Sequence, residues 1–156
     1  MADFTTTLPT KRMAACALFL NAQQEWLIVK PTYRPDWLVP GGTIDANESP
    51  LAACKREVKE EIGLDVPISQ PLCIAYQSPH GTRTESVQFV FWGGILIEDQ
   101  INAIQLPAEE LSQYRFVNPD TASQLLPPKL SHRLKFALMA RLESRIIYLE
   151  DNQQLI

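Results

Sequence analysis

The chain opens with two apolar runs that have the character of strands. Residues 12–20 ("RMAACALFL") and 25–30 ("EWLIVK") are separated only by the polar segment "NAQQ". Two such runs joined by a short polar segment predict two strands and a turn. Further on, "PLCIAYQS" and "ESVQFVFWGGILI" predict two longer strands, and "YRFV" predicts a short one. The double glycine at Gly93 and Gly94 indicates a bulge inside the second of the longer strands.

Between the second and third of these strands the pattern changes. The segment "PTYRPDWLVPGG" contains three prolines and a double glycine, which predicts a loop with a short strand at 37–39. Ser49 followed by Pro50 supplies an N-cap and a first-turn proline, and Gly63 is placed to end a helix. We therefore predict a helix from Pro50 to about Ile62. The apolar residues on one face of this helix are Leu51, Cys54, Val58 and Ile62.

The C-terminal part of the chain has helical spacing. "NPDTASQLL" begins with capping residues and predicts a short helix, and "PPKLSHRLKFALMARLES" predicts a longer one. Strands interspersed with helices predict a mixed α/β fold in a single domain over residues 1–156. We expect residues 1–10 to be flexible, and 145–156 to form a C-terminal tail that packs on its own domain or on a second subunit. The apolar face of the longer helix consists of Leu130, Leu134, Ala137, Leu138 and Leu142.

Composition narrows the class of protein. The chain has 156 residues, 46% of them hydrophobic, and a net charge of −4, which is unlike the basic footprint of a nucleic-acid-polymer binder. The longest apolar runs fall well short of the roughly 20 residues that cross a bilayer, and we read no secretory signal. The three cysteines form no zinc or disulfide pattern, so we expect a cytoplasmic, soluble protein with thiols in its core: Cys16, Cys54 and Cys73.

Three glutamates of the predicted helix are candidates for chemistry. Glu57, Glu60 and Glu61 lie three and four residues apart, so they share one helix face, where like charges repel. Arg56 stands four residues before Glu60 and can relieve part of this repulsion. Two interpretations stay open on these residues alone: a solvated acidic face, or a site for a divalent cation such as Mg²⁺, which prefers carboxylate oxygens and substrate phosphates.

The longer segment "GTIDANESPLAACKREVKEEIGL", from Gly42 to Leu64, resembles the Nudix box. It matches the pattern G-x5-E-x7-R-E-U-x-E-E-x-G-U, in which U is aliphatic, at every specified position. The chain is therefore similar to the Nudix hydrolase family. This resemblance implies an α/β/α sandwich with a mixed β-sheet. It also implies a pyrophosphohydrolase that cleaves the diphosphate bond of a nucleoside diphosphate linked to another moiety. The matched residues are Gly42, Glu48, Arg56, Glu57, Val58, Glu60, Glu61, Gly63 and Leu64.

The resemblance also implies roles for the matched residues. Glu57, Glu60 and Glu61 would bind Mg²⁺, for which Mn²⁺ can substitute, together with the backbone carbonyl at Gly42 or next to it. Glu57 would also position or deprotonate the attacking water. Among the remaining matched residues, Arg56 would orient the carboxylates while pairing with Glu48, and Glu48 and Gly63 would be structural.

One further glutamate lies outside the box. Members of the family often supply an acid from a loop six residues before an aromatic that begins a late strand. Glu110 stands six residues before Phe116 and is our candidate for a fourth metal ligand or the base, with Glu109 as second choice. An exposed loop position is the alternative interpretation of both.

Substrate contacts are less defined by the sequence. Tyr33, Trp37 and Tyr76 are candidates to stack on a base, with packing as the alternative. Arg34 and Arg83 lie in predicted loops and are candidates to contact phosphate. The implied partner is a nucleotide-derived small molecule, bound by a monomer or homodimer. The competing functions are a non-catalytic nucleotide-binding sensor or regulator on the same fold, and an isoprenyl diphosphate isomerase.

Overall fold

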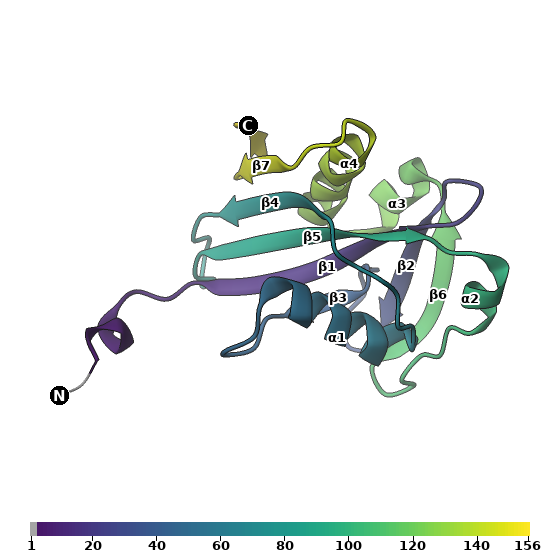
Figure 1. Ribbon diagram of the computed structural model, residues 1–156, viewed down its shortest axis with the longest axis horizontal. Coiled ribbons are helices and arrows are strands. Elements are labelled where there is room, and N and C mark those ends of the chain that lie inside the picture. Colours follow the sequence, from purple (N-terminus) through teal and green to yellow (C-terminus); the bar gives the residue numbers. More distant parts are fainter. Residues whose placement is uncertain (1–2) are drawn as a thin grey trace.

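The computed structural model describes residues 3–156, which form a central mixed β-sheet covered by helices (Figure 1). The sheet has eight strands in the order β6-β2-β1-β5-β4-β7-β8, with β3 paired to β1. The strands are β1 (Arg12–Leu20), β2 (Trp26–Pro31), β3 (Gly41–Thr43), β4 (Pro71–Gln77), β5 (Ser86–Ile95), β6 (Leu111–Val117), β7 (Ile147–Glu150) and β8 (Gln153–Gln154). The helices are the 3-10 helix η1 (Phe4–Thr7), α1 (Pro50–Ile62), α2 (Glu98–Asn102), α3 (Pro119–Leu125) and α4 (Pro128–Leu142).

The sheet is mixed at its centre. Strand β1 runs parallel to β5 but antiparallel to β2 and β3, and β4 is antiparallel to β5 but parallel to β7. Helix α1 lies on one face of this sheet, and α3 and α4 lie on the other (Figure 1). The predicted α/β/α sandwich with a mixed sheet is therefore confirmed.

Strand β1 shows how each face is buried. Successive side chains of a strand point to opposite faces. Ala15, Ala17 and Phe19 accordingly belong to the core beneath α1, while Leu18 and Leu20 belong to the core beneath α3 and α4. Burial on both faces explains why the run reads as continuously apolar rather than alternating.

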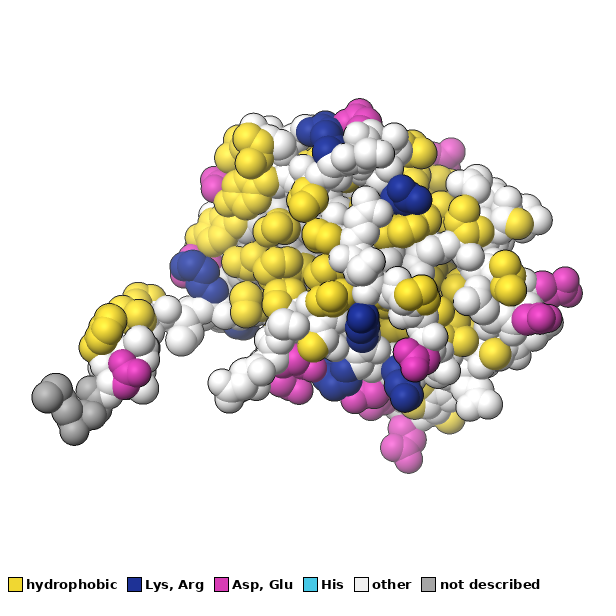
Figure 2. All heavy atoms as spheres, in the orientation of Figure 1, with side chains coloured by type: hydrophobic (Ala, Val, Ile, Leu, Met, Phe, Trp, Pro, Cys, Tyr) yellow, Lys and Arg dark blue, Asp and Glu magenta, His cyan; other side chains and the backbone are white. Residues whose placement is uncertain are grey.

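Helix α1 begins and ends where the sequence predicts. The Ser49 hydroxyl accepts a hydrogen bond from the Ala52 N–H at 3.1 Å, which caps the first turn. Gly63 ends the helix in a left-handed conformation (φ 71°) and donates its N–H to the Lys59 carbonyl at 3.0 Å. The apolar face packs on the sheet as expected, and the charged face is directed outward. Figure 2 shows acidic and basic side chains along the lower edge of the molecule, where Figure 1 places α1.

The predicted bulge is present at the double glycine. In the pairing of β1 with β5, Leu18 faces Trp92 but Phe19 faces Gly94, so Gly93 is the extra residue. A Cβ at Gly93 would lie 2.5 Å from the Phe19 ring. Glycine at this position lets the buried ring pack directly on the strand.

Other details of the chain differ from the sequence predictions. The strand expected at 37–39 is only an isolated bridge between Leu38 and Val29, and the strand lies instead at 41–43. Strand β6 starts three residues before "YRFV", and α2 was not predicted. On α4, Leu142 is 77% exposed rather than on the buried face, because it lies in the last turn, beyond the sheet.

The two ends of the chain also acquire structure. The segment predicted as a C-terminal tail adds β7 beside β4 and β8 beside β7, so the tail extends its own sheet. Within the segment predicted to be flexible, residues 4–7 form a 3-10 helix, and residues 1 and 2 lie outside the described residues. Among residues 3–156, no helix has the length and apolar content needed to span a membrane.

Candidate metal and substrate site

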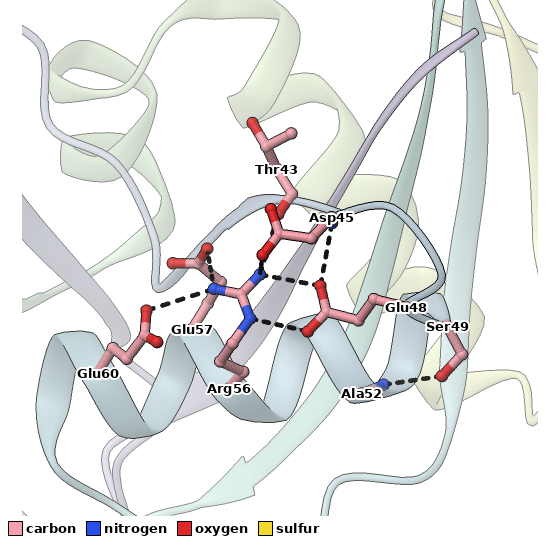
Figure 3. A network of polar contacts seen from close by, with 8 residues as sticks. All are labelled: Thr43, Asp45, Glu48, Ser49, Ala52, Arg56, Glu57 and Glu60. Carbon is pink, nitrogen blue, oxygen red and sulfur yellow. Dashed lines mark hydrogen bonds and ion pairs between the residues drawn. The ribbon is translucent and has the colours of Figure 1, made fainter. Parts of the chain in front are cut away.

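Arg56 is at the centre of a network on the exposed side of α1 (Figure 3). Its Nε and Nη2 atoms donate to the two carboxylate oxygens of Glu48 at 2.7 and 2.9 Å, a bidentate pair. Its Nη1 atom donates to Glu57 at 2.8 Å and to Glu60 at 3.3 Å, and Nη2 also donates to the Thr43 carbonyl at 3.2 Å. The predicted pairing of Arg56 with Glu48 is therefore confirmed, and Arg56 contacts two of the three candidate metal ligands.

Glu48 joins the loop before α1 to the helix. Besides pairing with Arg56, its carboxylate accepts the Asp45 N–H at 3.0 Å. These hydrogen bonds, that from Arg56 first, lower the pKa of Glu48 to about 2. Glu48 thus stays ionised across the physiological range, and its contacts support the structural role that the resemblance implied.

Glu61 is the most perturbed acid of the cluster. Its carboxylate accepts the Gly41 N–H at 3.2 Å. Burial raises the pKa of Glu61 to about 8, and the negative charges of Glu57, Glu110 and Glu60 add to this increase. A carboxylate held against β3 and surrounded by like charge is a group that a cation would stabilise.

Glu57 and Gly42 are in close contact. The Glu57 side chain is 16% exposed, and burial raises its pKa although the Arg56 guanidinium acts in the opposite direction. A Cβ at Gly42 would lie 2.5 Å from Glu57 Oε1. Glycine at this position therefore leaves room for the Glu57 carboxylate to lie against the β3 backbone.

The donor set suits a hard divalent cation. Carboxylates of Glu57, Glu60 and Glu61, with backbone carbonyls of β3 nearby, provide the oxygen atoms that Mg²⁺ and Mn²⁺ prefer. In the described part of the chain, no three acidic, histidine or cysteine side chains are already arranged to hold an ion. Glu57 and Glu60 instead form ion pairs with Arg56. The three glutamates therefore have the oxygen atoms that a metal site needs, while Arg56 neutralises the charge of two of them.

Glu110 lies on a different element from the α1 acids. It lies in the turn before β6, where its carbonyl accepts the Thr32 N–H at 2.9 Å. The negative charge of Glu110 is among the causes that raise the pKa of Glu61. Glu109 contacts Thr32 through its own backbone carbonyl. Glu110 therefore stays a predicted metal ligand or base, with Glu109 as second choice.

The aromatic candidates for substrate contact are not gathered at a site. Trp37 is buried in the core, 7% exposed, with the Arg115 guanidinium 4.9 Å from its ring centroid. Tyr33 is 73% exposed, and Tyr76 donates its hydroxyl to Glu85 at 2.6 Å. None of these three lines the cavity that has Gly41 and Gly42 in its wall, so their positions favour packing or surface roles over base stacking.

A cavity of about 690 Å³ has Gly41, Gly42 and Thr43 of β3 in its wall. Arg34 and Arg83, which the sequence had suggested, both line it, and Arg34 is paired with Asp36 at 2.9 Å. Sequence reasoning missed three other cations that line the cavity: Arg12, Lys129 and Arg133. A signal for Arg133 was present, because it stands among the apolar positions of the α4 face at helical spacing.

The raised pKa of Glu61 makes the stability of the metal-free protein pH-dependent. The pKa of Glu61 is about 8 in the folded state, whereas its usual value is 4.5, so the folded state keeps the proton up to about pH 8. The contribution of Glu61 to stability is therefore complete below pH 4.5 and is lost as the pH rises to 8. With EDTA present at pH 9, the free energy of unfolding of Glu61→Gln should exceed that of the wild type by about 1–3 kcal/mol, so the variant should unfold at higher urea.

The two proteins should differ much less at pH 5, where Glu61 is protonated and Glu48 stays ionised. Urea titrations at both pH values, with EDTA, measure the difference. A stability gap between the two proteins that is the same at pH 5 and pH 9 would contradict the burial-driven increase in the Glu61 pKa.

Comparison with known proteins places this geometry in a family. A Bacillus subtilis (strain 168) protein, provisionally named an 8-oxo-dGTP diphosphatase, is 36% identical over 81 residues, 52% of this chain and 52% of that protein. Diphosphoinositol polyphosphate phosphohydrolase 2 of Rattus norvegicus is 38% identical over 76 residues, 47% of this chain and 42% of that protein. This chain thus spans about half the length of the curated relatives it matches.

Similarity of fold covers more of the chain. The crystal structure of a MutT protein from Methanosarcina mazei Go1 has a TM-score of 0.67 and 23% identity, covering 88% of this chain and 98% of that one. The family model described as "NUDIX domain" matches residues 10–139, which include α1 and every strand from β1 to β6. The protein therefore belongs to the Nudix family.

Proposed function

We propose that this chain is a divalent-metal-dependent pyrophosphohydrolase that cleaves a diphosphate bond in a nucleoside diphosphate linked to another moiety, with water attacking phosphorus. The observation that carries the proposal is the position of the acidic face of α1. Glu57 and Glu61 lie against Gly41 and Gly42, and these two glycines also line a cavity with several cations. Strand β3 therefore lies next to the carboxylates that would bind a metal, and it also lines the cavity whose cations would bind an anionic substrate.

Each residue has a role that its contacts support. Glu57, Glu60 and Glu61, with the carbonyl of Gly42 or its neighbour, would hold Mg²⁺, for which Mn²⁺ can substitute. The chemistry supplied by the bound ion is neutralisation of the diphosphate and a lower pKa for water. Arg56 keeps Glu57 and Glu60 on the site side of α1 through its hydrogen bonds.

Proton transfer is the second requirement of the reaction. Glu57 is partly buried with a raised pKa, which makes it a better acceptor for a proton of water than an exposed glutamate. Glu110, in the turn before β6, is the other candidate for the base or for a further ligand, and its charge helps to raise the pKa of Glu61. Both carboxylates belong to the proposed machinery.

The substrate class follows the names of the relatives. One is named for 8-oxo-dGTP and the other for diphosphoinositol polyphosphates, and both of these compounds carry phosphoanhydrides. A cavity lined by arginine and lysine suits such anions. We accordingly propose a phosphate-rich small molecule, derived from a nucleotide, as the substrate.

A hydrolysis panel tests the proposal. Purified protein is incubated with nucleoside triphosphates, oxidised nucleotides, dinucleoside polyphosphates, ADP-ribose, NADH, coenzyme A and diphosphoinositol pentakisphosphate, with Mg²⁺ and separately with Mn²⁺. Glu61→Gln is the blank, and phosphorus NMR identifies the bond that is cleaved. Metal-dependent release of a phosphorylated product, absent in the blank, is the expected result. Tight binding of panel compounds without turnover would instead establish the sensor or regulator alternative.

A further inference from the structure

Arg133 is a cation in an environment that offers it no counter-ion. It lies on α4 facing the sheet and is 7% exposed. Within residues 3–156 the structure gives it no ion pair or hydrogen bond, and its Nε atom is buried with no hydrogen-bond acceptor. Burial lowers the pKa of Arg133, and the neighbouring thiols of Cys16 and Cys73 are no counter-ions at neutral pH because burial raises their pKa. Buried charges in proteins are normally paired, because an uncompensated one is costly.

A counter-ion for Arg133 could lie in the cavity that this side chain lines. Arg133 lines it, together with Lys129 one turn earlier on α4 and Arg83 from the loop between β4 and β5. Of the described residues that line this cavity, none is Asp or Glu. The other two lining arginines are engaged, since Arg12 donates to Thr84 and Arg34 pairs with Asp36. The cavity therefore concentrates positive charge with no protein anion in its wall.

Arg133 and the acidic face of α1 lie on different sides of β1. Cys16 of β1 lies close enough to both groups that the Arg133 cation and the Glu61 carboxylate each influence its thiol. Gly41 and Gly42 contact the α1 carboxylates and also line the cavity, so a bound molecule can extend from one region to the other. An anionic group bound at Arg133 would thus be a different part of the bound molecule from the diphosphate at the glutamates.

We propose that Arg133, with Lys129 and Arg83, binds a phosphate group on the part of the substrate that is not cleaved. This inference rests on the proposed function, which places the diphosphate against α1. A phosphate monoester is favoured because a guanidinium binds two of its oxygens side by side, and because a dianion matches several cations. The absence of Tyr33, Trp37 and Tyr76 from the cavity lining agrees with recognition by charge rather than by base stacking.

Binding of inorganic phosphate tests the site without metal or turnover. Isothermal titration with sodium phosphate, in EDTA and at constant ionic strength, is performed on the wild type, Arg133→Met and Lys135→Met. The control, Lys135→Met, removes a positive charge from the exposed side of the same helix. We expect Arg133→Met to bind phosphate about 10- to 100-fold more weakly, with no change in the control. Equal affinity in all three proteins would overturn the proposal.

Stability separates a binding role from a structural one. Because Arg133 has no partner among the described residues, Arg133→Met should keep or raise the Tm in the absence of phosphate. Phosphate should raise the Tm of the wild type and of Lys135→Met, but not that of Arg133→Met. A large fall in Tm with phosphate stabilisation retained would overturn the proposal. If Arg133→Met fails to fold, Arg133→Lys provides the same test, since it keeps the charge but loses the paired donors; unchanged phosphate affinity in it would count against the site.

Matched substrate pairs connect the phosphate site to the reaction. NADPH and NADH differ by one phosphate remote from the diphosphate, as do coenzyme A and dephospho-coenzyme A. The wild type should prefer the phosphorylated member of a pair through its KM, and Arg133→Met should lose that preference with little change in kcat. Turnover with the same preference in both proteins would overturn this inference alone. Weaker phosphate binding in Arg133→Met, without turnover of any compound, would support the phosphate site and refute the proposed function.

Discussion

Replacing Glu57 by glutamine is expected to lower kcat by about 10²- to 10⁴-fold, the range for loss of a positioned proton acceptor. The same change removes one charged metal ligand, so higher Mg²⁺ should be needed for the activity that remains. The fold should be kept, because the glutamine side-chain oxygen can still accept the Arg56 Nη1 donor that Glu57 accepts at 2.8 Å. Initial rates over a Mg²⁺ titration, with the best compound of the hydrolysis panel, measure both effects.

The control for this experiment is Glu98→Gln, which neutralises an exposed carboxylate on α2 away from the cluster. It should have wild-type rates and the same Mg²⁺ dependence. A Glu57→Gln protein with a wild-type circular dichroism spectrum and wild-type rates would remove Glu57 from the catalytic machinery. Glu110 would then be the remaining candidate for the base.

Replacing Gly41 by alanine is expected to lower the free energy of unfolding by about 2–4 kcal/mol. The added Cβ would lie 2.4 Å from the Ala15 carbonyl oxygen and 2.5 Å from the Cys16 Cβ. Both atoms are fixed in β1, the strand that pairs with β3, so relief requires the two strands to separate. Urea denaturation followed by circular dichroism measures the loss.

The substitution at the next residue, Gly42→Ala, should affect turnover more than stability. Its Cβ would meet the carboxylate of Glu57, the mobile end of a side chain, rather than backbone. The carboxylate can move, so we expect a loss of stability of less than about 1 kcal/mol together with a large loss of turnover. Similar losses of stability in the two variants would contradict the distinction between backbone contact at Gly41 and side-chain contact at Gly42.

The elements that the sequence predicted well are those whose signals are local. The cap at Ser49, the proline after it and the stop at Gly63 are all within the helix they define, so α1 was predicted at both ends. Strand β3 carries no such signal, since two of its three residues are glycine. It forms because β1 offers a pairing edge, and pairing between distant segments is not encoded in a short apolar run.

The same distinction applies to the candidate site. Three acids on one helix can be placed from their spacing alone, whereas Glu110 was found only through a resemblance. Trp37 was proposed as a substrate contact because an aromatic ring can stack on a base, but its side chain packs in the core beneath α3 and α4. Arg133 had a signal, a single charge among the apolar positions of a helix face, but that signal does not reveal the cavity that Arg133 lines.

Arg56 has a consequence for how the protein acquires its metal. Its guanidinium already contacts Glu48, Glu57 and Glu60, so the chain contains an internal counter-ion for the acidic face of α1. The helix can therefore fold before any divalent ion arrives, unlike small metal-dependent domains that are unfolded without their ion. An incoming metal ion then competes with Arg56, because it must replace this guanidinium, which belongs to the same helix, as the partner of Glu57 and Glu60.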